Sequence, residues 1–403
     1  MKSSLQLLPK YFTNRNLATF ILLIMMTQFV YFEGSSVSLF KVGIMALMPL
    51  IYIVKVPYIS KSFFWGIIYI FSVCIVAFLH SYIRISTIGF LALYVFTAIV
   101  FYNLIYSDAF TLEYFIKLLK CIIFAYTICL IAQQLFILIG IKFMPIINLN
   151  NQYFLSIDKL PSLSIEPSHT ARILMAAMFG YLKCNEFQQG KSIKFRQLFS
   201  NEHKWVTIGF LWTMLTMGSG TAFIGIGILS LYFVNRRTAF YVIPLIAVLF
   251  TISIQLESKQ FNRAISLGKA TLTGDVQLIK EADGSGASRI VPIINTFTDL
   301  DLTNVETWVG VGTTTIEHNT TGWKRDDVKM GAIEQYGLLT YIISLLFIFN
   351  CFIRKILSIE TLVFIILLGC SLSNVYYVWG ILMLFCVIKY FEGKYKYRVL
   401  YEQ

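Results

Sequence analysis

The sequence predicts an all-α polytopic membrane protein, a helical bundle with about twelve transmembrane helices. Of its 403 residues, 57% are hydrophobic and only 13% are charged, whereas a soluble globular protein carries roughly a quarter charged residues. The apolar runs are long enough to cross a hydrocarbon layer of about 30 Å. The net charge of +12 is therefore attributed to cytoplasmic loops rather than to a nucleic-acid-binding surface.

The apolar segments follow one another with short connections. They are residues 17–33, 37–54, 62–80, 86–106, 114–139, 168–183, 205–217, 221–235, 239–255, 336–353, 360–373 and 375–390. If the N-terminus is cytoplasmic, basic residues gather on the cytoplasmic side and in the C-terminal tail, as the positive-inside rule requires. The first run lacks a small-residue cleavage site and is expected to be a retained span. Both termini are then cytoplasmic.

One long connection divides the chain into three parts. Residues 1–255 hold the first nine spans, residues 256–335 form an extracytoplasmic subdomain, and residues 336–403 hold the last spans and a basic cytoplasmic tail. The middle part has eight basic and eleven acidic residues, a negative balance in an otherwise basic chain. Its apolar spacing predicts short helices over residues 256–270 and 287–297.

Residues 164–172 are the stretch densest in reactive groups. Pro167 has a fixed φ and no N–H, which predicts that it begins a helix with Glu166 as the cap. His169 and Arg172 then lie on neighbouring faces, close to the positive end of that helix. Because this end of the helix is positive, the stretch suits an anion, and the predicted topology places it at the outer membrane surface. The alternative is an ordinary interfacial helix start, with Arg172 reaching lipid head groups.

Further candidate residues lie in the long outer connection. Arg289 is a candidate clamp for phosphate oxygens, because arginine binds them in a bidentate manner. Gly310 and Gly312 belong to a tight loop that would let the backbone approach a ligand. His318 and Asn319 follow this loop and could orient a sugar hydroxyl, although a loop histidine is more often simply exposed. All five are candidates for contact with a ligand.

Two more polar side chains are assigned to substrate binding. Ser168 stands beside the proposed cap, and Arg84 lies in a short outer connection, where a plain surface charge is the alternative. The seven cysteines and four histidines show no metal-ligand or disulfide spacing. The sequence therefore predicts no metal site and no cofactor.

The order of these features resembles the Wzy-type O-antigen and exopolysaccharide polymerases, which share a fold with the O-antigen ligases. The resemblance covers roughly residues 162–345. It is carried by Glu166-Pro167-Ser168, Gly218-Ser219-Gly220, Arg289, Gly310-Val311-Gly312, His318-Asn319 and the span start Glu334-x-Tyr336-Gly337-Leu338-Leu339. His169 departs from the aromatic residue usual in the family. The ligase pattern, a histidine-polar pair followed at fixed distance by G-x-x-G, is only half met, which favours a polymerase.

The resemblance implies a multi-pass glycosyltransferase of the bacterial inner membrane with its active site on the outer face. Donor and acceptor would be oligosaccharides linked to undecaprenyl pyrophosphate, and the acceptor hydroxyl would attack the anomeric carbon of the donor. Arg172 and Arg289 would stabilise the departing pyrophosphate. Glu166, or else His169, would act as the base. Membrane lipid and a chain-length regulator protein are the implied partners, with no nucleic acid and no metal.

Three alternatives stay open. A ligase would transfer finished glycan from the same lipid to another acceptor. A flippase or transporter would carry charged residues along a central cavity, whereas the candidates here gather at one outer face. The third alternative is a purely structural membrane protein, and the clustering of arginines is the only sequence argument against it.

Overall fold

The computed structural model describes residues 13–28, 38–55, 59–80, 85–141, 159–234, 259–282, 284–312, 329–372 and 375–401. Within these ranges, the side chains of residues 259–265, 285, 288–289 and 396–401 are not described. Arg84, His318, Asn319 and the predicted span at 239–255 lie outside the described residues.

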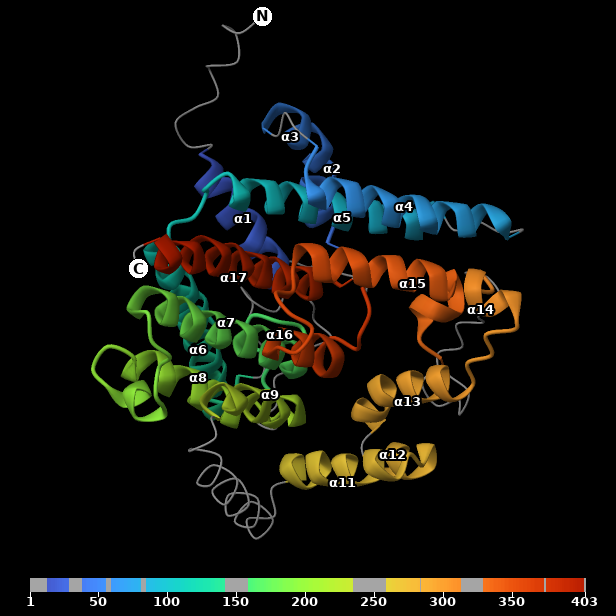
Figure 1. Ribbon diagram of the computed structural model, residues 1–403. Coiled ribbons are helices and arrows are strands. Elements are labelled where there is room, and N and C mark those ends of the chain that lie inside the picture. The colour runs from blue at the N-terminus through green and yellow to red at the C-terminus, as the bar shows by residue number, and fades with distance from the viewer. Residues whose placement is uncertain are drawn as a thin grey trace, which may run out of the picture.

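Every regular element in the described part of the chain is helical (Figure 1). The longer helices are α1 (Asn14–Met26), α2 (Leu39–Ala46), α3 (Met48–Lys55), α4 (Lys61–Leu79), α5 (Ile85–Tyr106), α6 (Leu112–Leu138), α7 (Pro167–Gln189), α8 (Lys204–Thr216), α9 (Gly220–Ser230), α11 (Lys259–Thr273), α12 (Val276–Ala282), α13 (Gly284–Thr298), α15 (Gly331–Cys351) and α17 (Tyr376–Tyr401). Shorter elements are α14 (Val305–Val309), α16 (Ile359–Leu362), a π-helical turn (Val363–Leu367) and 3-10 turns at Phe195–Phe199 and Leu231–Phe233.

Five of the helices in the described ranges are long and apolar enough to cross a membrane. They are α4, α5, α6, α15 and the Tyr376–Tyr395 part of α17. Two shorter apolar helical segments, α1 and Gly220–Phe233, accompany them. The all-helical architecture is thus confirmed for the described residues, and the length and composition of these helices are typical of a membrane-embedded protein. The total of about twelve spans and the side on which each end lies stay predictions.

The centre of the bundle is α17, which packs against α1, α5 and α7 (Figure 1). Trp379 on α17 is fully buried and stacks on Tyr94 of α5, with 5.7 Å between ring centroids. Gly180 allows α7 to approach closely, because a Cβ at that position would meet the side chain of Leu384 at 3.0 Å. At the start of the two helices, Tyr377 of α17 contacts His169 and Arg172 of α7.

A buried ion-pair cluster follows the C-terminal end of α15. Glu360 is fully buried and accepts hydrogen bonds from Nε and Nη2 of Arg354, the second at 3.1 Å. Glu392 of α17 lies 3.3 Å from Nη1 of the same guanidinium. Lys389 donates hydrogen bonds to the carbonyl oxygens of Phe349, Asn350 and Ile353, each at 2.8 Å. These contacts join α15, α16 and α17 at one end of the bundle.

Glu360→Leu is expected to destabilise the protein by about 3–5 kcal/mol, because it strands the buried guanidinium of Arg354 without its main partner. The double variant Arg354→Met/Glu360→Leu should recover most of this loss, since no buried charge then remains unpaired. Thermal unfolding of the purified chain in detergent measures both. A double variant no better than the single one would show that the pair itself supplies the stability.

A small helical unit lies beside the bundle. Helices α11, α12 and α13 enclose a core of their own, made of Leu267, Ala270, Ile279, Ala287 and Val291. Helix α13 also reaches the bundle, because Ile293 packs against Met330 and Ile333 at the start of α15. Figure 1 shows α13 between the α11–α12 pair and the N-terminal part of α15. Its bounds include the predicted helix at 287–297.

Candidate functional site

Helix α7 begins as its sequence predicts. Glu166 is the N-cap, with φ −129° and ψ 148°, and Pro167 is the first helical residue. The Glu166 side chain makes no capping hydrogen bond; instead its Oε2 accepts one from the hydroxyl of Ser168 at 3.1 Å. With 57% of its side chain exposed, the Glu166 carboxylate stays accessible.

Arg172 is buried, with only 5% of its surface exposed. Its Nη1 donates a hydrogen bond to the Tyr377 hydroxyl, and its guanidinium carbon lies 5.3 Å from the centre of the same ring. The Nε of Arg172 has no hydrogen-bond partner among the described residues. The guanidinium of Arg172 therefore lies among protein side chains. A buried donor without a partner is costly, which favours a ligand that accepts from it.

His169 stands one turn before Arg172 and is held from three sides. Its Nδ1 lies 2.8 Å from Oε1 of Gln28, which follows the end of α1. Its ring lies against Tyr377, with 4.4 Å between ring centroids. Its Nε2 is 3.8 Å from Oε2 of Glu166. Tyr377 therefore contacts both His169 and Arg172.

A second basic side chain is buried near the residues that contact His169. Lys41 of α2 is only 1% exposed; its Nζ donates a hydrogen bond to the carbonyl oxygen of Thr27 and lies 4.4 Å from the centre of the Tyr376 ring. Thr27 and Tyr376 are the chain neighbours of Gln28 and Tyr377. In the described part of the chain, no carboxylate forms an ion pair with Lys41 or with Arg172. A buried guanidinium without an ion-pair partner is expensive, so the region around Arg172 favours an anion.

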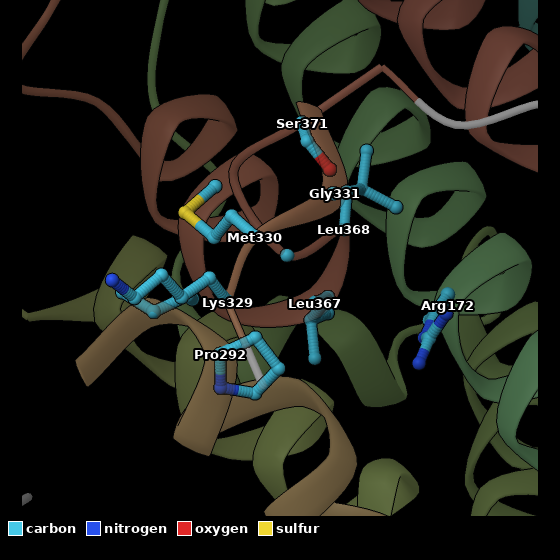
Figure 2. Close-up of a pocket in the computed structure, with 10 residues that line it drawn as sticks. Arg172, Pro292, Lys329, Met330, Gly331, Leu367, Leu368 and Ser371 are labelled. Carbon is cyan, nitrogen blue, oxygen red and sulfur yellow. The ribbon is translucent and has the colours of Figure 1, made fainter. Parts of the chain in front are cut away.

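A pocket of about 260 Å³ opens beside Arg172. It is lined by Arg172, Pro292, Ile293, Lys329, Met330, Gly331, Leu367, Leu368, Gly369 and Ser371. Figure 2 shows Arg172 on one side, with Lys329, Met330 and Pro292 on the other. The pocket thus joins α7, the α13 helix of the long connection and the segments flanking α15 and the π-helical turn. Two cations and several apolar side chains share its wall.

Hydrogen bonds and an ion pair attach α13 to this pocket. The hydroxyl of Thr296 donates to the carbonyl oxygen of Pro292 at 2.6 Å and accepts from the backbone N–H of Met330 at 2.7 Å. Nζ of Lys329 lies 3.6 Å from Oδ2 of Asp299. Arg289 precedes Pro292 by three residues on α13. Its backbone position is therefore one helical turn from the pocket wall. Its side chain is among those that the structure does not describe.

The glycine loop packs against its own chain. A Cβ on Gly310 would lie 2.5 Å from the carbonyl oxygen of Gln335, and one on Gly312 would lie 2.9 Å from Cγ of His80. The facing position, Gly337, interrupts α15 with φ 78° and ψ 165°. These contacts, with the backbone of Gln335 and the side chain of His80, and the positive φ of both residues account for the glycines of the loop. A contact of Gly310 or Gly312 with substrate stays a prediction.

Several residues of the site were not identified from sequence. Gln28 carries no recognisable motif, and Tyr377 reads as one more interfacial aromatic at a span start. Lys329 did leave a signal, because the predicted topology places this basic residue on the outer side, where basic residues near an apolar run are less common. No group of three potential metal ligands occurs among the residues that the structure describes.

Comparison of the chain with models of protein families, with curated proteins and with solved structures finds no match. The site must therefore be interpreted from its own residues.

Proposed function

We propose that the chain is an integral-membrane glycosyltransferase that polymerises oligosaccharide units linked to undecaprenyl pyrophosphate, at the outer face of the bacterial inner membrane. The observation that carries this proposal is the buried guanidinium of Arg172, which lines a pocket shared with α13 and has an unpartnered Nε. The resemblance of residues 162–345 to the Wzy-type polymerases supplies the reaction.

The chemistry requires positive charge that is already in place before the reaction. When the bond between the anomeric carbon and the lipid diphosphate breaks, negative charge builds on the leaving oxygen. A fixed guanidinium in a site with little water stabilises this charge more strongly than the ground state, which lowers the barrier. Arg172 is fixed by Tyr377. In this proposal, Lys329 and Arg289 add charge from the other side of the pocket.

The remaining pocket wall suits the carrier. Pro292, Ile293, Met330, Leu367 and Leu368 are apolar, which favours the first isoprene units next to the diphosphate. Apolar walls also exclude water and so strengthen the attraction between the cations and the diphosphate. The acceptor sugar would approach from the exposed side, where Glu166 lies.

The test uses the purified full-length chain in lipid nanodiscs. Its probe is the lipid-linked oligosaccharide fraction extracted from a strain of the host that lacks this gene. A polymerase converts this fraction alone into a ladder of longer glycans and releases undecaprenyl diphosphate. If the fraction stays unchanged until a different acceptor is added, the chain is a ligase. If the units cross the bilayer of a vesicle without growing, the chain is a transporter.

Arg289→Ala is expected to lower ladder formation at least about a hundredfold, the usual cost of removing one fixed donor to developing charge. Lys280→Ala on α12 is the matched control, because it removes a cation from the same helical unit without touching the pocket. Equal ladders from Arg289→Ala and wild type would remove Arg289 from the site.

A further inference from the structure

We propose that Gln28 is a positioning residue that fixes the tautomer of His169, so that Nε2 of His169, rather than Glu166, accepts the proton of the attacking hydroxyl. This inference rests on the proposed function and assigns a role that the sequence leaves open between His169 and Glu166. Gln28 has no assignment from sequence. It becomes visible only because the end of α1 lies against the first turn of α7.

Gln28 is well placed to set the proton on His169. Its side chain is 2% exposed, and its own backbone N–H donates to the carbonyl oxygen of Leu163 at 3.1 Å, which fixes its position beside α7. Its Oε1 lies 2.8 Å from Nδ1 of His169. A carboxamide oxygen only accepts hydrogen bonds, so Nδ1 must carry the hydrogen. In the neutral imidazole the lone pair is then on Nε2.

Two other contacts keep the ring in that orientation. The Tyr377 ring lies against it with an interplanar angle of 31°, and the Tyr377 hydroxyl is itself held by Arg172. The base and the cation for the leaving group thus share one support. An activated base that is oriented by a third group is the usual arrangement for hydroxyl nucleophiles.

Glu166 is better suited to a supporting role. Its Oε2 lies 3.8 Å from Nε2 of His169, too far for a hydrogen bond but close enough to attract an imidazolium. The same oxygen accepts the hydroxyl of Ser168. With more than half of its side chain exposed, the carboxylate is largely hydrated. Its position and hydration therefore suit electrostatic support of the His169 ring.

The acceptor hydroxyl gives its proton to Nε2 of His169, and its oxygen forms a bond to the anomeric carbon of the donor. The bond between that carbon and the diphosphate oxygen breaks, and its electron pair leaves with the lipid diphosphate beside Arg172. The imidazolium, bonded to Gln28 through Nδ1–H and attracted by Glu166, then releases the proton from Nε2 to water.

The pH profile of ladder formation tests this assignment. The charged and titratable groups around the ring are Glu166 and Arg172 from α7 and its cap and Tyr377 from α17, with Lys41 of α2 reaching Thr27 next to Gln28. Gln28→Glu places a carboxylate on Nδ1–H, which should raise the pKa of His169 and move the acidic limb of the profile about one unit upward. Gln28→Leu removes the acceptor and should move the acidic limb downward.

Opposite shifts from two variants at one position separate a positioning role from a structural one. A structural role would lower the rate in both variants and leave the limb in place, which would overturn the inference. If neither Gln28 variant folds, the rates of His169→Asn and Glu166→Gln decide. If His169 is the base, the rate should fall by about 10²–10⁴-fold in His169→Asn and by less than about tenfold in Glu166→Gln. The reverse order would make Glu166 the base.

The same assay distinguishes failure of the proposed function from failure of the role assigned to Gln28. Absence of ladders from the wild-type chain would overturn the proposed function and this inference with it. Wild-type ladders with an unshifted acidic limb in both folded Gln28 variants would overturn the role of Gln28 alone.

Discussion

Arg172→Ala is expected to abolish chain extension, so that lipid-linked single units accumulate in a host that carries only this variant. Removal of one fixed donor to developing charge costs about 10²–10³-fold in rate, and Arg172 is in addition the buried cation that lines the pocket. Arg172→Lys should also be poor, because an ammonium cannot reproduce the planar guanidinium that contacts Tyr377. Gel analysis of extracted glycan measures both variants.

The amount of folded protein must stay normal for this result to be informative. No described carboxylate pairs with Arg172, so its removal strands no buried anion. Arg172→Met keeps much of the side-chain volume and should therefore yield folded, inactive protein. Arg196→Ala is the control, because Arg196 is an exposed arginine on a 3-10 turn remote from the pocket. Normal chain length from Arg172→Met would exclude Arg172 from catalysis.

Gly337→Ala is expected to remove most of the folded protein. The φ of 78° and ψ of 165° at this position are accessible to glycine and strained for any other residue. A Cβ there would also lie 2.1 Å from the carbonyl oxygen of Trp308 and 2.6 Å from the backbone nitrogen of Gly310. Because neighbouring backbone cannot move aside like a side chain, the combined loss should be about 3 kcal/mol or more.

The matched control for this prediction is Gly89→Ala. Gly89 lies inside α5, and nothing is within 4 Å of a Cβ added there. Alanine is favoured over glycine inside a helix by about 0.5–1 kcal/mol, so this variant should be as stable as the wild type or slightly more stable. Size-exclusion profiles and unfolding temperatures in detergent compare the two. Normal folding of Gly337→Ala would show that the break in α15 is not required.

Features that depend on local chemistry could be predicted from the sequence. The start of α7 follows from a proline at its first position. Helices α4, α5 and α6 lie within a few residues of the apolar runs that predict them, since the length of such a run is itself a local property. The character of residues 164–172 as a polar stretch at a helix start was visible for the same reason.

Features that depend on which helices are neighbours could not be predicted. The apolar run at 336–353 suggests a span that begins at 336, whereas α15 begins at Gly331 and breaks at Gly337. The break exists because the backbone of residues 308–312 packs against it. Likewise, Gln28 and Tyr377 join the site only because the segment that follows α1 and the start of α17 lie against the first turns of α7. Hydropathy indicates which segments form apolar helices, but not which helices are in contact.

The break in α15 also determines how the pocket can open. On the N-terminal side of Gly337, two hydrogen bonds join the first turn of α15 to the glycine loop. The N–H of Val311 donates to the carbonyl oxygen of Glu334 at 2.9 Å, and the N–H of Gly312 donates to that of Gln335 at 3.2 Å. At its other end, α15 is pinned by Lys389. The C-terminal part of α15 is therefore held in place, and the segment before Gly337 can change its angle relative to it. We expect motions that open the pocket to be rotations of the segment before Gly337 about that residue, and not sliding of the whole helix.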